Sequence, residues 1–420
     1  MTKMDGNSDI TVLILLDAFR WDYISKEFSP FLHRFSDARN SITGLSRELF
    51  GFQMRDAFFA GLYPESSNIS NMYIYSPETS PFKFTKYMPA IFDKLPRFKH
   101  LTRNVITKRV RKKITYSALK CYATPIEMPI NLLQYFDFSE KYLPWEKHLN
   151  VPTLFDMLKE NNFKWEYFGW PIVTDYNSDR KIVEEFKQRI GSSDSFIYIH
   201  LSQLDGLGHI YGPESIEVKK GVNEIDSLVK QILDHSNQIF DKVNFIVFAD
   251  HGMVEIKQTL DIMKELKNTG LKLEKDYIIF LDSTMARFWF KNDKAKKQIT
   301  ELLQNLKGGK ILSEEDYKKH RIRFKDNRYG DLIFLADPGT LIHPNFFQMQ
   351  GEPVKGMHGY DPDYKDNQGL FILNSPQIKE KRDVGIVDLV DIFPTILDLM
   401  GLPIPETCEG RSIIRDWRET

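Results

Sequence analysis

Three short apolar runs, each followed within a few residues by an aspartate, restrict the folds open to this chain. They cover residues 10–16, 196–201 and 245–249 and are rich in β-branched and aromatic side chains. Their length and continuous apolar character predict strands that are buried on both faces. A helical pattern of apolar residues lies between the last two runs, at 222–234. Strands that alternate with helices predict an α/β fold with a mainly parallel sheet covered by helices on both faces.

The chain has 420 residues, which is enough for two or three domains or for one large α/β domain with insertions. We expect a single domain over residues 1–420 that carries two insertions. Residues 81–150 are rich in proline, aromatic and basic residues, and we expect them to form an inserted cap. Residues 255–345 are expected to form a small α/β subdomain. Its predicted elements are strands at 286–290 and 331–336 and a helix at 294–306.

Composition excludes several classes of protein. Hydrophobic residues make up 42% and charged residues 27% of the chain, which are values of a globular protein and not of a disordered or collagen-like one. The 57 Lys and Arg and the 58 Asp and Glu nearly cancel, so no overall field attracts the molecule to nucleic acid. The two cysteines, Cys121 and Cys408, show no CxxC spacing and cannot build a disulfide framework.

The apolar run near the start of the chain indicates where in the cell the protein is expected. Residues 10–16 are far fewer than the roughly 20 that span a bilayer. The run also lacks the cationic region and the cleavage site that flank a secretion signal. We therefore expect no transmembrane segment and a cytoplasmic protein, either free or peripheral to the membrane.

Acidic residues and histidines follow the predicted strands closely. An isolated aspartate after a strand is usually a turn or helix-cap residue, so only the joint pattern is informative. The six side chains are Asp17, Asp205, His209, Asp250, His251 and His358. The first five follow carboxyl ends of parallel strands, where α/β sheets bind their ligands. Carboxylate oxygens and imidazole nitrogens suit zinc, and also manganese or iron. Six ligands are too many for one catalytic ion with an open position and fit two ions with three ligands each.

The motifs around these residues resemble a known family. They are Leu15–Ile24, Gly61–Ser66, Asp205–Pro213, Ala249–Met253, His358–Tyr360 and Asp388–Pro403. Their content and order resemble the type I phosphodiesterase/nucleotide pyrophosphatase group of the alkaline phosphatase superfamily. The resemblance covers roughly residues 1–80, 150–255 and 320–415.

The resemblance implies a fold, an activity and two ligand sets. Asp205, His209 and His358 would hold one divalent ion, and the other ion would be held by Asp17, Asp250 and His251. The fold would be alkaline phosphatase-like. The protein would be a metal-dependent hydrolase of phosphodiester or pyrophosphate bonds in a small phosphate-ester substrate, with phosphoryl transfer as a variant. Zn²⁺ is the expected metal, and Mn²⁺ or Fe are alternatives.

One position departs from the family. Its Thr or Ser nucleophile lies ten residues before the glycine of the Gly-Leu-Tyr-Pro motif, and this chain has Gly51 there. The nearest upstream hydroxyls are Ser46 and Thr43, which are the candidate nucleophiles. The family's phosphate-binding asparagine corresponds to Met54. The adjacent Arg55 is a candidate phosphate ligand, because a guanidinium can bind phosphate oxygens by paired hydrogen bonds. We expect a single in-line displacement by water or an acceptor hydroxyl, with Ser46 or Thr43 as competing nucleophiles.

The motifs leave two alternatives to the proposed activity. A phosphomonoesterase, or a metal-binding member without catalysis, would share the same ligands.

Residues 94–113 contain nine Lys or Arg and no acid. They form either the solvated face of the cap or a surface that attracts a polyanion or an anionic membrane. Nucleic acid is not expected, because no base-stacking motif is present.

Overall fold

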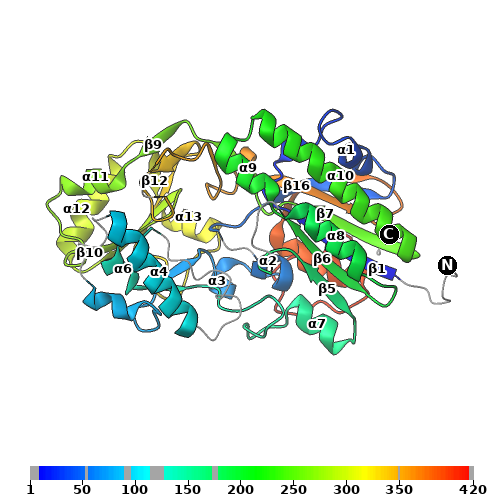
Figure 1. Ribbon diagram of the computed structural model, residues 1–420, viewed down its shortest axis with the longest axis horizontal. Coiled ribbons are helices and arrows are strands. Elements are labelled where there is room, and N and C mark those ends of the chain that lie inside the picture. Colours follow the sequence, from blue (N-terminus) through cyan, green and yellow to red (C-terminus); the bar gives the residue numbers. More distant parts are fainter. Residues whose placement is uncertain are drawn as a thin grey trace.

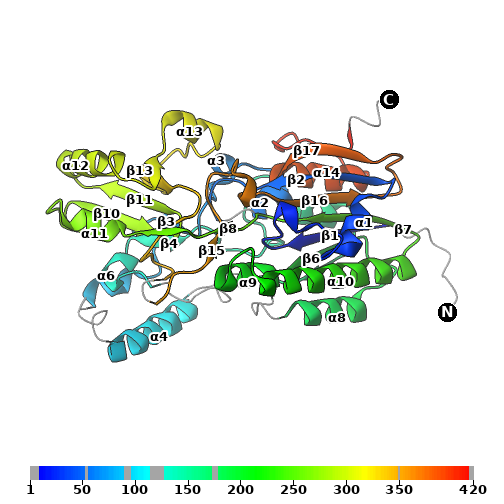
Figure 2. The same cartoon turned by 90° about the horizontal axis from the view of Figure 1, so that it is seen from above.

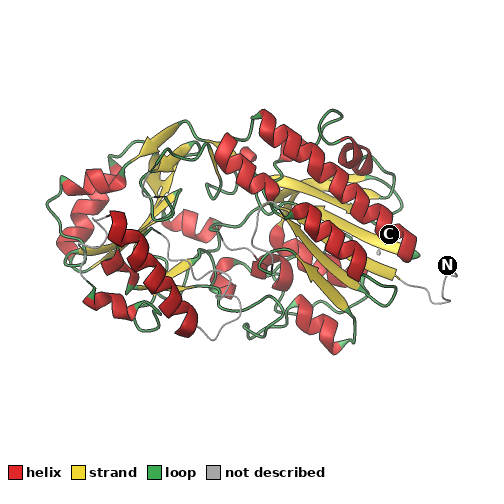
Figure 3. Cartoon of the chain, viewed as in Figure 1, coloured by secondary structure: helices red, strands yellow, loops and turns green. Residues whose placement is uncertain are grey.

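The computed structural model contains two lobes, each built around a β-sheet (Figure 1). The sheets and the helices that pack on them are also distinguished by colour in Figure 3. The structure describes residues 9–52, 55–88, 96–113, 127–172, 178–348 and 351–415.

The larger lobe contains a seven-stranded sheet. In spatial order its strands are β17 (Arg382–Asp388), β2 (Ser41–Arg47), β16 (Gly369–Asn374), β7 (Lys242–Phe248), β1 (Asp9–Leu16), β6 (Phe196–Leu201) and β5 (Trp165–Phe168). Strand β16 runs antiparallel to both of its neighbours, and the other four neighbouring pairs are parallel. The mainly parallel sheet predicted from the sequence is therefore confirmed.

Helices cover both faces of this sheet. Strand β1 shows why, since its even-numbered side chains from Ile10 to Leu16 enter one hydrophobic core and Leu13 and Leu15 enter the other. Alternating side chains point to opposite faces of a strand, so an entirely apolar strand needs a cover on each face. One face carries α1 (Pro30–Ser36), α8 (Asp179–Arg189) and α10 (Ile216–Ile239). The other carries α2 (Arg55–Ala60), α7 (Leu154–Glu160) and α14 (Ile392–Leu399).

The smaller lobe contains a four-stranded antiparallel sheet. Its strands are β10 (Tyr277–Leu281), β11 (Met285–Phe290), β13 (Leu332–Ala336) and β12 (Gly309–Ile311). Its other helices and strands are α11 (Ile262–Lys267), α12 (Asp293–Gln304), α13 (Glu314–Lys319), η2 (Lys83–Tyr87), α4 (Pro96–Lys113), α6 (Ile130–Leu133), β3 (Tyr73–Tyr75) and β4 (Phe136–Phe138). The strands and helix predicted within 255–345 lie where expected, with ends that differ by one or two residues.

The described part of residues 81–150 does not pack as a separate layer. Phe82, Ile106 and Phe136 share one hydrophobic core with Phe280 and Phe334 of the four-stranded sheet. The boundaries proposed for the cap and the subdomain stay predictions. The described residues of the cap up to Phe138 pack in the smaller lobe, whereas Trp145 packs against the core of the larger lobe. No helix among the described residues combines the length and apolar character needed to cross a membrane.

Short elements lie on the segments of chain that run between the two lobes. They are α3 (Pro64–Ser67), β8 (Val254–Glu255) with its partner β15 (Gly356–Met357), and β9 (Gln258–Leu260) with its partner β14 (Thr340–Ile342). Helix α9 (Gln203–Tyr211) follows β6 and packs within the larger lobe. Helix α9 and the β8–β15 pair lie at the end of the large sheet that faces the smaller lobe (Figure 2).

Candidate active site

The first group of candidate ligands follows two neighbouring strands. Strands β1 and β7 are paired in parallel, and Asp17 and Asp250 lie just beyond their carboxyl ends. His251 follows directly, and its Nε2 lies 3.3 Å from Asp17 Oδ1 and 3.8 Å from Asp250 Oδ1. One ligand atom of each of the three residues lies within 4.8 Å of the other two.

The second group combines a helix with a loop. Asp205 and His209 lie four residues apart on α9, so both side chains project from one face of the helix. His358 follows β15, whose pairing with β8 brings it back beside residues 250–251. His209 Nε2 lies 3.1 Å and His358 Nε2 lies 3.8 Å from Asp205 Oδ1. The three residues again offer ligand atoms within 4.8 Å of one another.

Two glycines permit this close arrangement. A Cβ atom on Gly356 would lie 2.5 Å from the carbonyl oxygen of Gly208, and one on Gly252 would lie 2.2 Å from that of Asp366. Only glycine avoids such contacts. The backbone near Gly356 also orients a ligand, because His209 Nδ1 donates to the Gly356 carbonyl at 2.8 Å. That bond leaves Nε2 of His209 free to face Asp205.

The two groups adjoin each other. The rings of His251 and His358 are stacked, with 3.6 Å between centroids and 2° between planes. The structure thus brings together all six residues singled out in the sequence, in the two sets of three that the family resemblance implies. Their role as metal ligands stays a prediction.

The site chemistry fits divalent ions. Asp205 Oδ1 is buried, and the imidazole nitrogens nearest to it are those of the other two candidate ligands, His209 and His358. Ligands at about 2.0–2.2 Å from a zinc ion lie roughly 3–4 Å from one another, which is close to the spacings found in both groups. Oxygen and nitrogen donors in sets of three also leave room for a fourth ligand, as catalytic zinc sites require.

Burial and neighbouring charges shift the pKa values of the candidate ligands in different directions. Burial acts to raise the pKa of Asp17, but hydrogen bonds from His200 and His251 outweigh it and hold that pKa below its usual value. Burial and the charge of Asp17 raise the pKa of Asp250 to about 6. Burial and the neighbouring His251 and His209 hold the pKa of His358 well below its usual value. His358 therefore stays neutral near pH 7 and keeps a lone pair for a metal.

His200 is a site residue that the sequence reasoning missed. It lies near the end of β6, and its Nε2 donates to Asp17 Oδ2 at 2.9 Å. Asp17 Oδ1 faces His251, so His200 fixes the orientation of the carboxylate. The only signal in the sequence is a histidine within an apolar run, and such a residue is more often part of a core.

We expect the loss of His200 to weaken metal binding at Asp17. Hydrogen-bond partners of metal ligands typically contribute 10–100-fold to affinity. His200→Ala should therefore lower the affinity for one ion by roughly that factor, whereas His200→Asn should retain part of it because its amide N–H can still donate. Competition with a coloured chelator measures both. The control is His235→Ala, which removes a histidine that contacts the Lys187 carbonyl on α8. Equal affinities for all variants would contradict this role.

Glu48 is a second residue near the candidate ligands that the sequence reasoning missed, close enough for the charges of His251 and Asp250 to act on its carboxyl group. It is buried just beyond β2, and the side-chain amide of Asn367 donates to its carboxylate. Burial raises its pKa well above the usual value. Nothing in the local sequence distinguishes it from a surface glutamate.

The candidate nucleophiles lie within the sheet. Ser46 is fully buried on β2, and its hydroxyl donates to the carbonyl of Ala249 at 2.6 Å. The hydroxyl of Thr43 donates to the carbonyl of Arg382 at 3.3 Å. Both hydroxyls are thus bonded to backbone carbonyls. Met54, the position of the family's asparagine, lies outside the described residues.

Gly51 has no room for a side chain. Its φ is +120°, and a Cβ atom there would lie 2.3 Å from the carbonyl oxygen of Ser70. Phe52 donates its backbone N–H to the same carbonyl at 2.8 Å, which fixes the segment against Ser70. The ring of Phe52 lies 5.5 Å from that of His358, so this segment borders the candidate ligands.

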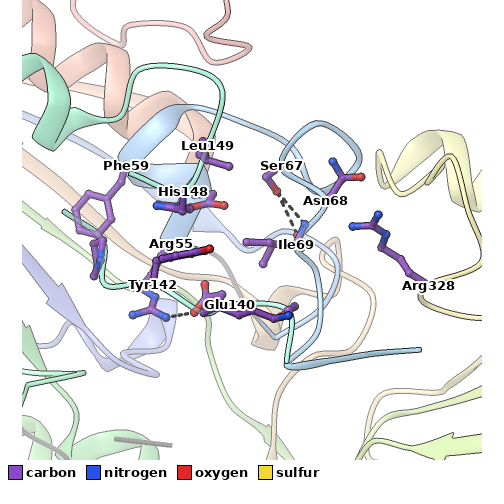
Figure 4. Close-up of a pocket in the computed structure, with 14 residues that line it drawn as sticks. Arg55, Phe59, Ser67, Asn68, Ile69, Glu140, Tyr142, His148, Leu149 and Arg328 are labelled. Atoms are coloured by element: carbon purple, nitrogen blue, oxygen red, sulfur yellow. Dashed lines mark hydrogen bonds and ion pairs between the residues drawn. The ribbon is translucent and has the colours of Figure 1, made fainter. Parts of the chain in front are cut away.

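Arg55 opens α2 and lines a pocket beside the site. Its guanidinium forms an ion pair with Glu140 and lies 4.3 Å from the centre of the Trp170 ring, which in turn lies 6.3 Å from the ring of His200. The pocket measures about 150 Å³ (Figure 4). Polar residues predominate around it, including Ser67, Asn68, Glu140, His148 and Arg328.

Comparisons with known proteins agree with this architecture. The family described as Type I phosphodiesterase / nucleotide pyrophosphatase matches residues 11–361. The chain is 23% identical over 220 residues to ectonucleotide pyrophosphatase/phosphodiesterase family member 7 of Mus musculus, a match that covers 51% of this chain and 49% of the relative. It is 26% identical over 226 residues to venom phosphodiesterase 2 of Crotalus adamanteus, a match that covers 50% of this chain and 26% of the relative. The chain thus spans half the length or less of these relatives.

Solved structures show the same fold. Human ectonucleotide pyrophosphatase/phosphodiesterase 5 superposes with a TM-score of 0.69 at 15% identity and covers 97% of this chain and 99% of its own. An inactive form of the murine protein, solved in complex with AMP, gives a TM-score of 0.67 at 14% identity, and the match covers 94% of this chain and 96% of the murine chain. The family match extends over most of the chain and includes all six candidate ligands in the expected order, and so the chain belongs to the type I phosphodiesterase/nucleotide pyrophosphatase family.

Proposed function

We propose that this protein hydrolyses phosphodiester or pyrophosphate bonds with the help of two divalent ions. The observation that carries the proposal is the pair of adjacent three-residue groups at the carboxyl edge of the parallel sheet. Asp17, Asp250 and His251 would hold one ion. The other would be held by Asp205, His209 and His358. Zinc suits these ligands best, and manganese or iron would also be accepted.

The residues of the chain prepare the site for this reaction. Bound ions would stabilise charge on the attacking and leaving oxygens of an in-line displacement at phosphorus. His200 holds the Asp17 carboxylate in place, and the Gly356 carbonyl holds the ring of His209. Asp205 and His251 are buried and the other four ligands are half-buried, which strengthens their attraction for cations.

Arg55 would bind the phosphate group or the part of the substrate beside it. Its guanidinium is connected through Trp170 to His200 and so to Asp17. Glu140 neutralises the cation in the free protein. A substrate phosphate would offer the guanidinium a second acceptor in the same pocket.

A substrate panel tests the proposed reaction. Nitrophenyl monoester, nitrophenyl diester and nucleotide-sugar substrates would be compared with added zinc or manganese. We expect the diester or the pyrophosphate to react faster than the monoester by roughly tenfold or more, equivalent to about 1.4 kcal/mol in the barrier. A faster monoester would identify a phosphomonoesterase instead.

One observation favours a non-catalytic alternative. Gly51 removes the hydroxyl at the nucleophile position, and its surroundings exclude any replacement. A member of the family that had lost catalysis would still bind metal. Two bound ions with no turnover of any substrate in the panel would support that alternative.

A further inference from the structure

The outer surface of α4 joins exposed apolar side chains to a cluster of cations. Leu101 is 62% exposed and Val105 is 51% exposed, and Tyr87 of the adjacent η2 is 84% exposed. The exposed cations beside them are Lys83, Lys86, Lys108, Arg109, Arg111 and Lys112. We call this set the α4 surface.

The helix is held in this orientation by its opposite face. Thr102, Ile106 and Val110 are buried, and the last two belong to the core of the smaller lobe. Arg109 lies 4.3 Å from the centre of the Phe84 ring, which connects α4 to η2. The exposed apolar residues are therefore presented by a packed helix and not by a frayed end.

The spacing places apolar and basic groups on one side of α4. Leu101, Val105, Lys108 and Lys112 follow one another at intervals of four, three and four residues, which is one face of a helix. The described residues 80–88 and 96–113 contain no acid, and within the described chain none of the six cations is paired with a carboxylate. Since the whole chain has a net charge of −1, this positive charge is a local feature.

We propose that the α4 surface docks on an anionic lipid bilayer. Apolar side chains on a basic helix enter the boundary between headgroups and acyl chains, while Lys and Arg bind anionic headgroups. A soluble polyanion would use the cations but not Tyr87, Leu101 or Val105. Figure 2 shows α4 on the same side of the molecule as α9, which carries two candidate metal ligands. A docked molecule would hold that side toward the bilayer.

Vesicle sedimentation with the full chain tests the proposal. We expect binding to vesicles of phosphatidylcholine with phosphatidylglycerol at low salt and little binding to phosphatidylcholine alone. Each Lys or Arg near an anionic surface contributes about fivefold, so Lys108→Gln/Arg111→Gln/Lys112→Gln should weaken binding on the order of 100-fold. Leu101→Ser/Val105→Ser should weaken it as well, because two apolar anchors are lost. High salt should weaken the charge contribution.

Matched controls make each outcome decisive. Lys294→Gln/Lys296→Gln/Lys297→Gln changes three exposed lysines of α12, removes the same charge, and should bind vesicles normally. All substituted side chains are exposed, and far-ultraviolet circular dichroism would verify that the variants fold. No binding to anionic vesicles at low salt would overturn the proposal. Equal binding of Leu101→Ser/Val105→Ser, or tighter binding of heparin or nucleic acid than of vesicles, would overturn it too and identify a site for a soluble polyanion.

Discussion

Asp250→Asn and His358→Ala proteins are each expected to retain one divalent ion where the unaltered protein binds two. Asp250 belongs to one group of three candidate ligands and His358 to the other, and ligand atoms within each group lie within 4.8 Å of one another. A set of two ligands binds an ion far more weakly than a set of three, so one position should empty in each variant. Elemental analysis of protein purified without chelator measures the stoichiometry.

Activity should fall steeply in both variants. Stabilisation of a phosphoryl transition state by an ion is worth several kcal/mol, and so we expect a loss on the order of 10³-fold in kcat/KM. Asp234→Asn and His33→Ala are suitable controls, because neither residue belongs to the two groups. Asp234 pairs with Lys230 on the exposed side of α10. Protein that contains no metal and takes up none when metal is added would contradict the two-ion site.

The sequence was most informative where chemistry and local pattern coincide. The strands β1, β6 and β7 are apolar on both faces because helices cover both faces of the sheet, and that leaves a strong signal. Asp17 and Asp250 were predicted to meet because parallel neighbours end at the same edge. His358 follows Asp250 by 108 residues in the sequence, and only the family resemblance implied which of the two ions it would hold.

Other features depend on contacts between distant segments. The pairing of Arg55 with Glu140 joins α2 to a loop of the smaller lobe, and no local pattern marks it. The core that Phe82, Ile106 and Phe136 share with the four-stranded sheet was missed for the same reason, because composition indicated a cap but not the segment on which it packs. His200 resembles a core residue until Asp17 is seen beside it.

The lack of space for a side chain at Gly51 leads to a prediction about the nucleophile. Gly51→Ser should not gain activity, although it supplies the hydroxyl that the family has at this position. Its Cβ would lie 2.3 Å from the Ser70 carbonyl, and its φ of +120° is unfavourable for any side chain. The backbone strain alone costs roughly 1–3 kcal/mol, so the variant should unfold at a lower temperature.

Gly270 provides a comparison in which a side chain has free space. Its φ is +70°, and a Cβ atom added there would have no neighbour within 4 Å, so Gly270→Ser carries a milder backbone strain and no clash. We expect Gly51→Ser to lower the unfolding temperature more than Gly270→Ser does. A gain of activity in Gly51→Ser would show that the segment can move away from Ser70.

Without a nucleophile at Gly51, a single displacement by water or an acceptor hydroxyl is the expected route, and it inverts the configuration at phosphorus. A covalent route through Ser46 or Thr43 would require two displacements and would retain it. Both hydroxyls already donate to backbone carbonyls, and Ser46 is completely buried, so a covalent route would have to break one of these bonds. A chiral phosphorothioate turned over in isotopically labelled water distinguishes the two results. Retention, together with inactive Ser46→Ala or Thr43→Ala protein that still binds two ions, would identify the missing nucleophile.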